Sequence, residues 1–198
     1  MSKTIDLRSP LSFRNSIRYP IQSEVSRKEV VIGGLLLLLP VIGWILNMGH
    51  RIRMTHRMQH GLSAWPSWED PVDLFKHGSL TFLGMLEYHF PAILAFAFAY
   101  LTSQSWLYFV GAVLWILATL AVPGYMTHYC YSLNPQEIFN PFRAMRRVFE
   151  GGGAYWKAWL IVLAGLALSF TGLLFFGIGF LFTSVWFWQS AGFSFATV

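Results

Sequence analysis

Four long apolar stretches constrain the fold of this chain more than any other feature. They cover residues 30–49, 79–101, 106–127 and 154–198. Only 12% of the residues are charged, whereas soluble domains carry roughly 25%. Apolar stretches of this length, with so few charges, are typical of helices that cross or enter a bilayer. The sequence therefore predicts an all-α integral membrane protein that passes the membrane several times.

The last apolar stretch is too long for one crossing, because an α-helix rises only ~1.5 Å per residue. We expect it to break near its glycines into one segment near 154–175 and another near 178–195. The glycines expected at the break are Gly172, Gly177 and Gly179. The predicted fold is thus a bundle of about four or five transmembrane or re-entrant helices.

The first apolar stretch, residues 30–49, contains residues that interrupt helices, and it fits either a kinked crossing or a re-entrant hairpin. The interrupting residues are Gly33, Gly34, Pro40 and Gly43. Loops rich in Lys and Arg stay in the cytoplasm, which places the basic segments 50–78 and 134–153 inside and the uncharged turn 102–105 outside. Because residues 1–28 are also basic, a re-entrant hairpin is the favoured interpretation.

Between the first two apolar stretches, residues 65–78 carry the signals of a short helix. Asp70 is a good N-cap, Pro71 suits the first helical position, and Gly78 can end the helix. We expect a short amphipathic helix at the membrane interface here.

A second element, residues 134–153, carries similar signals. Asn140 is the expected N-cap, Pro141 starts the helix, and the glycines from Gly151 end it. Apolar side chains fall on one face and three arginines on the other, which is typical of a helix that lies on a membrane surface. The arginines are Arg143, Arg146 and Arg147.

The predicted organisation is a polar, basic arm at residues 1–28 followed by one helical membrane domain at 29–198. The order of apolar, polar and capped segments is similar in residues 30–103 and 105–178. Two interpretations stay open: an internal duplication, which is common in membrane bundles, or a similarity that arises from helix caps alone.

Several residues together resemble an uncharacterised family of bacterial and archaeal membrane proteins, the domain of unknown function 4013. They are Tyr19-Pro20, Gly33-Gly34, Pro40, Gly49, Arg53, Trp65-Pro66, Trp68, Asp70, Leu74, Gly78 and the late segments Gly177-Ile178-Gly179 and Phe182-Thr183. His50 stands where that family usually carries a tyrosine. The resemblance implies a multi-helix inner-membrane protein and transfers no functional residues.

Glu87, in the second apolar stretch, is the candidate intramembrane polar site, with His89 nearby. An acidic residue inside a membrane segment is a functional candidate by default. The competing interpretation is that Glu87 lies near the interface and pairs with Lys76 or Arg57.

His56 and His60 have the spacing of metal ligands, but Arg53 and Arg57 lie on the same helix and disfavour a divalent cation, so we predict no metal site. We also predict no cofactor and no catalytic set of residues, because no phosphate-binding loop, nucleophile elbow or HExxH motif occurs.

Six arginines are the candidate contacts for anionic lipid or a membrane-protein partner: Arg51, Arg53, Arg57, Arg143, Arg146 and Arg147. They flank apolar segments, so the net charge of +5 indicates lipid head groups and not nucleic acid. Tryptophans near segment ends fit an aromatic belt. We expect a non-catalytic interaction or accessory subunit of the inner membrane or another prokaryotic internal membrane. The alternative is a small transporter or channel component that uses Glu87.

Overall fold

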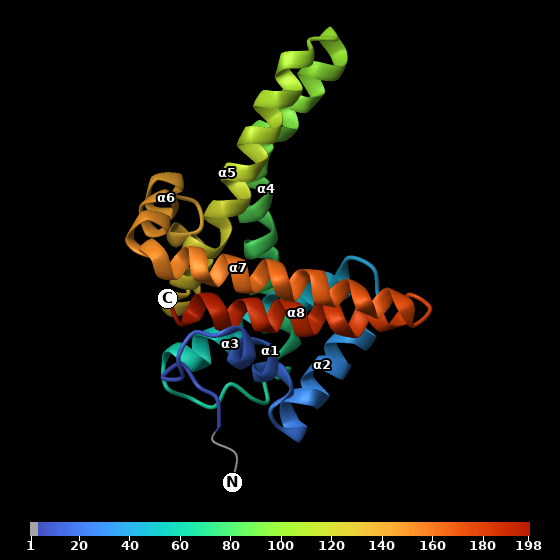
Figure 1. Cartoon of the computed structure of the whole chain (residues 1–198), viewed down its shortest axis with the longest axis vertical. Helices are drawn as coiled ribbons and strands as arrows, with labels where there is room; N and C mark the ends of the chain where they lie inside the picture. The colour runs from blue at the N-terminus through green and yellow to red at the C-terminus, as the bar shows by residue number, and fades with distance from the viewer. Residues whose placement is uncertain (1–3) are drawn as a thin grey trace.

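A computed structural model describes residues 4–198, and every regular element among them is helical (Figure 1). The all-α prediction is confirmed. The α-helices are α1 (Phe13–Arg18), α2 (Glu24–Leu36), α3 (Ile42–Gln59), α4 (Pro71–Thr102), α5 (Ser105–Ser132), α6 (Pro141–Glu150), α7 (Gly152–Ser169) and α8 (Ile178–Ala196). Short 3-10 turns cover Tyr19–Ile21, Pro135–Glu137 and Phe170–Leu174.

Three helical hairpins build the molecule: α2–α3, α4–α5 and α7–α8. In Figure 1 the α4–α5 hairpin projects away from the rest, while α7 and α8 run crosswise to its base. Glycines of α2 face α8, because a Cβ on Gly33 or Gly34 would meet Val185 or Phe182. The turns of α2–α3 and α7–α8 consequently lie at the same end of the molecule (Figure 1).

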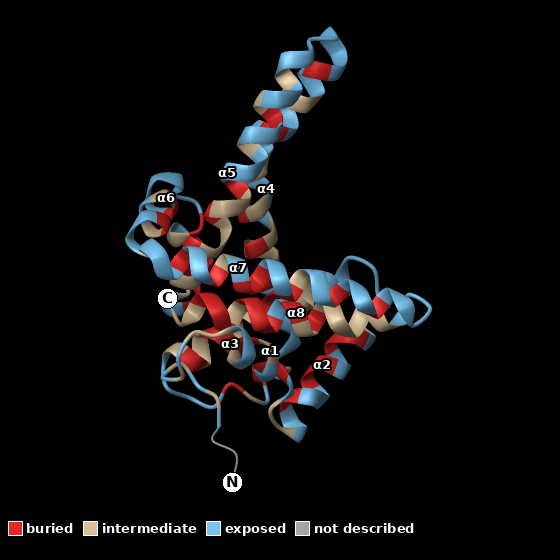
Figure 2. Ribbon diagram, in the orientation of Figure 1, coloured by how far each residue is buried: buried red, intermediate tan, exposed pale blue. Residues whose placement is uncertain are grey.

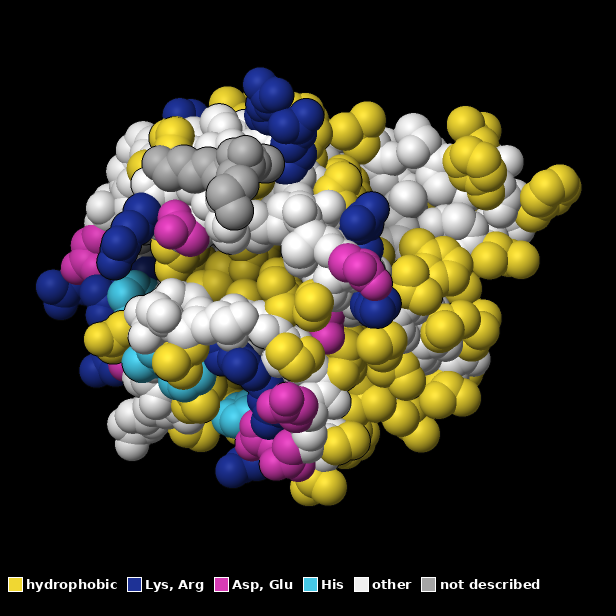
Figure 3. All heavy atoms as spheres, turned by 90° about the horizontal axis from the view of Figure 1, so that it is seen from below, with side chains coloured by type: hydrophobic (Ala, Val, Ile, Leu, Met, Phe, Trp, Pro, Cys, Tyr) yellow, Lys and Arg dark blue, Asp and Glu magenta, His cyan; other side chains and the backbone are white. Residues whose placement is uncertain are grey.

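Uncharged sequence coincides with the ends of these hairpins. Residues 30–49, 88–136 and 158–198 contain no Asp, Glu, Lys or Arg, and each stretch includes one helix reversal. Large apolar side chains are exposed there, and Phe176 is 99% exposed; Figure 2 shows the outer half of α4–α5 to be mostly exposed. In Figure 3 the end on the right carries hydrophobic side chains, whereas most charged side chains lie at the left and centre.

Three of the described helices are long and apolar enough to cross a membrane: Pro71–Thr102, Ser105–Ser132 and Gly152–Leu174. The predicted hairpin around the 102–105 turn is present. The predicted break in the last apolar stretch also agrees with the structure, in which the chain reverses between Ser169 and Ile178.

The first apolar stretch is not one continuous helix. The chain reverses between Leu36 and Ile42. The Asn47 side-chain amide of α3 donates to the Gly33 carbonyl oxygen of α2 at 3.0 Å, and also to the Gly43 carbonyl oxygen of its own helix at 2.8 Å. The kinked crossing is therefore wrong and the hairpin is correct, while its re-entrant position in a bilayer stays a prediction.

The expected short helix at residues 70–78 is wrong. Asp70 does cap the helix, because its carboxylate accepts from the Asp73 backbone N–H at 3.2 Å, but α4 continues through Gly78 to Thr102. Gly78 serves close packing and not termination, since a Cβ there would overlap the Ile45 carbonyl oxygen of α3. The second expected helix is present as α6, whose N-cap Asn140 accepts from the Arg143 N–H at 3.1 Å.

The part of the predicted N-terminal arm that the structure describes, residues 4–28, includes helix α1 and packs on α8. Tyr19 stacks on Phe193 with ring centroids 4.4 Å apart, and the Trp186 indole donates to the Ile17 carbonyl at 2.9 Å. Helix α2 runs through the boundary predicted at residue 28. Residues 1–3 lie outside the described residues, and the duplication of 30–103 and 105–178 stays a prediction.

The contact between α3 and α4 requires two glycines and yields a first prediction. A Cβ on Gly49 would overlap the Leu74 carbonyl oxygen, and one on Gly78 the Ile45 oxygen, so alanine forces the backbones apart. We expect Gly49→Ala and Gly78→Ala each to lower the free energy of unfolding by roughly 1–3 kcal/mol, as overpacked cores do. Thermal unfolding in mild detergent measures this.

Gly153→Ala is the matched control. A Cβ on Gly153 meets no atom within 4 Å, and alanine favours helix by roughly 0.5–1 kcal/mol over glycine, so this variant should unfold no earlier than the wild type. Equal stability of all three variants would show that the α3–α4 contact tolerates added volume.

Candidate functional site

A buried carboxylate, Glu29 of α2, joins three segments at the base of the hairpins. Glu29 Oε2 accepts from the backbone N–H of Ser67 at 3.0 Å and from the Ser67 hydroxyl at 3.1 Å. His50 Nε2 of α3 lies 2.9 Å from the same oxygen and 2.8 Å from Ser67 Oγ. All three residues are buried. We call Glu29, His50 and Ser67 the Glu29 network.

Aromatic side chains enclose this network. The His50 ring stacks on Trp68 with centroids 4.0 Å apart, and the Trp68 indole N–H donates to the Glu29 backbone carbonyl at 3.1 Å. Trp65 also stacks on His50, with ring centroids 6.0 Å apart, and packs against Tyr19. Three of the residues that carry the family resemblance, Tyr19, Trp65 and Trp68, therefore meet at the junction of α2, α3 and the segment before α4.

The pKa values in the network follow from burial and hydrogen bonding. Burial raises the pKa of the Glu29 carboxyl, but the interactions with His50 and Ser67 lower it by more, and the net pKa lies below its ordinary value. Burial lowers the pKa of His50, and Glu29 only partly opposes this. At neutral pH the network therefore holds an ionised carboxylate that accepts from a neutral imidazole and from serine.

The Glu29 network does not have the geometry of a nucleophile, a base and an orienting acid. In such triads the serine and the acid bind opposite nitrogens of the imidazole. Here both oxygens lie at His50 Nε2, and the Ser67 side chain is fully buried. The arrangement satisfies buried polar groups and holds the segments together.

A second polar chain runs from α3 through α4 to α5. Arg53 Nη2 donates to Asp73 Oδ2 at 2.7 Å, Asp73 Oδ1 lies 3.1 Å from His77 Nε2, and His77 Nδ1 bonds the Tyr129 hydroxyl. Asp73 Oδ2 thus connects α4 to α3, Oδ1 binds His77 one turn further along α4, and His77 extends the chain to α5 at the base of the α4–α5 hairpin.

Five of the six candidate arginines have carboxylate partners within this chain. Arg53 pairs with Asp73, Arg57 lies 3.8 Å from Glu69, and Arg143 pairs with Glu137. Arg146 and Arg147 share Glu150, each at 2.7 Å. Arg51 differs: among residues 4–198 no carboxylate lies within ion-pair distance of its guanidinium. The contacts of these six arginines with lipid or a partner stay a prediction.

The structure separates Glu87 from His89. The Glu87 side chain is exposed on the outside of α4, and its expected pairing with Lys76 or Arg57 is absent from the ion pairs of the described residues. His89 points inward, where its Nδ1 donates to the Met85 carbonyl at 2.7 Å and its Nε2 lies 3.2 Å from Thr119 Oγ1. Glu87 lines neither of the two cavities that flank α5.

His56 of α3 and His60, the residue after its end, each have one ring nitrogen at a backbone carbonyl oxygen. His56 Nδ1 lies 2.7 Å from the Cys130 carbonyl oxygen and His60 Nδ1 2.8 Å from the His56 oxygen. Among residues 4–198 no cluster of three His, Cys, Asp or Glu side chains has the geometry to hold a metal ion.

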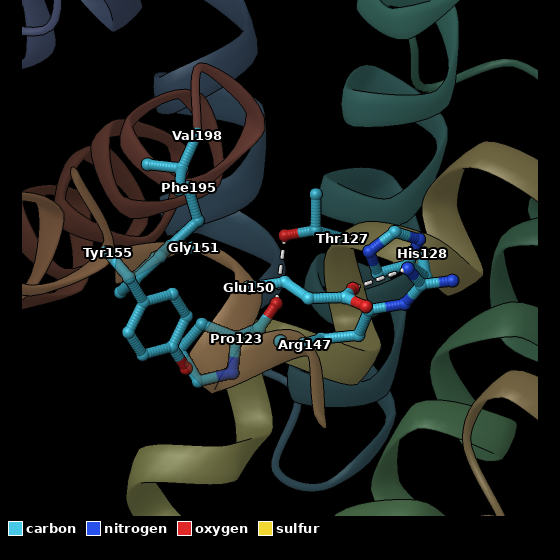
Figure 4. A pocket seen from close by; sticks show the side chains of 10 residues that line it. Pro123, Thr127, His128, Arg147, Glu150, Gly151, Tyr155, Phe195 and Val198 are labelled. Atoms are coloured by element: carbon cyan, nitrogen blue, oxygen red, sulfur yellow. Dashed lines mark hydrogen bonds and ion pairs between the residues drawn. The ribbon is translucent and has the colours of Figure 1, made fainter. Parts of the chain in front are cut away.

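Two cavities flank α5. Figure 4 shows the smaller one, about 180 Å³, where Pro123 and Thr127 of α5 face Arg147 and Glu150 of α6 and Tyr155 of α7. The Arg147–Glu150 ion pair lies across it and points toward His128 (Figure 4). The larger cavity, about 350 Å³, lies between the α4–α5 and α7–α8 hairpins and contains Arg51.

The family described as protein of unknown function (DUF4013) matches residues 32–187. No curated protein and no solved structure matches the chain.

Sequence reasoning missed Glu29 and Ser67. Glu29 borders the first apolar stretch, and an acidic residue at that position is a signal of the kind that drew attention to Glu87. Ser67 carries no such signal, because a lone serine in a loop is common and only the folded chain brings its N–H and hydroxyl to Glu29.

The Glu29 network yields a prediction about stability. Glu29→Ala leaves the Ser67 N–H and hydroxyl and His50 without their acceptor, and we expect a loss of roughly 3–5 kcal/mol in the free energy of unfolding. Glu29→Gln retains one acceptor oxygen and should lose less. The matched control is Glu24→Gln, an exposed carboxylate paired only with Lys28, which should leave unfolding in detergent unchanged. An equally small effect of Glu29→Ala would contradict the assigned role.

The same network predicts a pH dependence. Both Glu29 and His50 have a lower pKa in the folded state, so the unfolded chain binds more protons as the pH falls. Stability should therefore be full above about pH 6.5, the ordinary histidine value, and decline below it. In the His50→Gln variant, the melting temperature should fall less steeply between pH 7 and 5 than in the wild type. A variant that keeps the wild-type slope between pH 7 and 5 would exclude His50 as its source.

Proposed function

The chain belongs to the DUF4013 family of proteins of unknown function, and we propose that it is a non-catalytic integral membrane protein that acts as an interaction or accessory subunit at an anionic lipid surface. The observation that carries this proposal is the separation of charge from the hairpin ends. The uncharged stretches 88–136 and 158–198 each contain a helix reversal with exposed apolar side chains. Such surfaces are stable in lipid and unfavourable in water.

The charged base of the hairpins supports a cytoplasmic orientation of that side. The ion pairs of α3, α4 and α6 all lie there, and basic segments beside apolar helices stay in the cytoplasm. The proposed protein thus places the α4–α5 turn in or beyond the bilayer and the junction of α2, α3 and α4 inside the cell.

Helix α6 is the proposed lipid contact, and its phenylalanines contribute more than its arginines. Phe142 and Phe149 are 87% and 77% exposed, and burying each would contribute roughly 1.5–3 kcal/mol. The three arginines of α6 face two carboxylates, Glu137 and Glu150, which leaves a net charge of about one. Attraction to anionic lipid is worth only ~1 kcal/mol per such charge, so apolar contact dominates.

Spin labels on single cysteines test the lipid contact of α6. In a Cys130→Ala background, which removes the sole cysteine, labels at positions 142 and 149 should be accessible to oxygen from the bilayer. A label at the exposed position 143, about a quarter-turn or more around α6 from both phenylalanines, is the matched control and should be accessible to a water-soluble nickel complex. Equal access of the nickel complex to all three labels would contradict the proposed docking of α6.

Cysteine labelling in intact cells tests the orientation. In the same background, a membrane-impermeant maleimide should react with a cysteine at Ser103, in the α4–α5 turn, from outside the cell. A cysteine at the exposed Gln136, before α6, should react only after the membrane is permeabilised. The reverse pattern would overturn the orientation, and reaction of both sites in a soluble fraction would overturn the membrane location.

A further inference from the structure

The cavity between the α4–α5 and α7–α8 hairpins has apolar walls and one charged group. Its volume is about 350 Å³, within the ~300–1,000 Å³ typical of ligand sites. Side chains from α3, α4, α5, α7 and α8 line it, and most are apolar, including Met126, Val162, Trp159 and Phe187. Arg51 of α3 supplies the charge.

The cavity is elongated and opens to the surface. Thr119 and Cys130 of α5 both line it, and the eleven residue-to-residue steps between them rise about 16 Å along the helix. Leu163, which also lines it, is 51% exposed, so the wall opens on the α7 side. An apolar cavity of ~150 Å³ holds one benzene ring, so this volume accommodates an alkyl chain of roughly a dozen carbons.

Arg51 lies beside the Cys130 end of the cavity without a counter-charge. Its guanidinium carbon lies 5.0 Å from the Trp188 ring centroid, and its Nη2 is 3.9 Å from the Met126 sulfur. Its neighbours Arg53 and Arg57 on α3 both have carboxylate partners, whereas no acidic side chain of residues 4–198 pairs with Arg51. A half-buried charge among apolar groups is costly unless an anion accompanies it.

We propose that this cavity binds a single-chain amphiphile with an anionic head group, with the carboxylate or phosphate on Arg51 and the alkyl chain between the two hairpins. A guanidinium binds either oxyanion through two parallel hydrogen bonds. The apolar walls from Cys130 to Thr119 match the chain. A free inorganic anion would leave these walls unoccupied, and an uncharged amphiphile would leave Arg51 without a partner.

The inference rests on the proposed membrane location for the source of the ligand, because a bilayer supplies fatty acids and lysophospholipids to an opening on α7. It adds to that proposal an internal ligand site distinct from the surface contact of α6. The two sites share no arginine, since Arg51 is on α3 and the arginines of α6 are paired with Glu137 and Glu150.

Ligand binding to the whole protein in phosphatidylcholine nanodiscs tests the site. Trp159 and Trp188 line the cavity, so bromine-labelled dodecanoate and dodecyl phosphate should both quench tryptophan fluorescence saturably. Bromine-labelled dodecanol, which lacks the charge, and inorganic phosphate, which lacks the chain, should bind far more weakly. Native mass spectrometry of protein taken directly from membranes then identifies whether the bound mass is a fatty acid or a lysophospholipid.

Arg51→Gln should weaken binding of both anionic probes roughly 10- to 100-fold, the usual worth of a charge-assisted hydrogen bond. The matched control is Arg146→Gln, an exposed arginine on α6 outside the cavity, which should bind as the wild type does. No saturable quenching by either anionic probe, equal binding of dodecanol, equal competition by inorganic phosphate, or an Arg51→Gln variant within twofold of the wild type would each overturn the proposal.

Thr119→Phe keeps the test decisive if Arg51→Gln fails to fold. A larger side chain at the far end of the cavity shortens it while Arg51 is unchanged, so the preference should shift from dodecanoate toward octanoate by roughly tenfold. An unchanged preference for chain length would overturn the site. Failure of these measurements with the cysteine-labelling pattern intact refutes the cavity alone, whereas a reversed labelling pattern refutes the proposed orientation alone.

Discussion

The carboxylate of Glu29 is the interaction on which the rest of the structure depends. It binds α2 to His50 of α3 and to Ser67 in the segment before α4, so three chain segments share one buried acceptor. Because an ionised carboxylate is costly in an apolar interior, its stability requires that all of these donors stay in place. The position at which α4 begins, and hence the direction of the α4–α5 hairpin, follows from this junction.

Close backbone contact completes the junction. Gly49 of α3 faces the Leu74 carbonyl and Gly78 of α4 faces the Ile45 carbonyl, an arrangement in which small residues let helices approach without side chains between them. Arg53, Asp73 and His77 then satisfy one another along the edge of the same contact. Polar groups are thus concentrated where helices cross, and the hairpin ends are left uncharged.

This division explains why Arg51 is unusual. Other charged side chains of α3 reach carboxylates at the edge of the base, but Arg51 faces the apolar space that remains where the α7–α8 hairpin passes the base of α4–α5. Helices that cross at a large angle touch near the crossing point and separate away from it, which leaves space between the two hairpins. The resulting cavity and its one cation are therefore consequences of the same geometry that the Glu29 network maintains.

Local signals predicted several elements well. Asn140 and Pro141 begin α6 as expected, the 102–105 turn joins α4 and α5, and the glycines near 172–179 mark the reversal between α7 and α8. The same reasoning failed at Gly78, because a glycine that ends a helix and a glycine that permits a close crossing are identical in sequence. It also overlooked Glu29, which borders the first apolar stretch, and singled out Glu87 as the acidic residue within an apolar stretch, whereas Glu87 is exposed.

The sequence by itself determined the all-helical class, the reversals between apolar segments and the caps of individual helices, because each depends on a few neighbouring residues. Only the tertiary structure decided which polar groups meet. Glu29, His50 and Ser67 are separated by 21 and 17 residues along the chain, and Arg51 lies 75 residues from Met126. Such pairings arise from the directions in which hairpins cross, and crossing directions depend on the packing of all the helices at once.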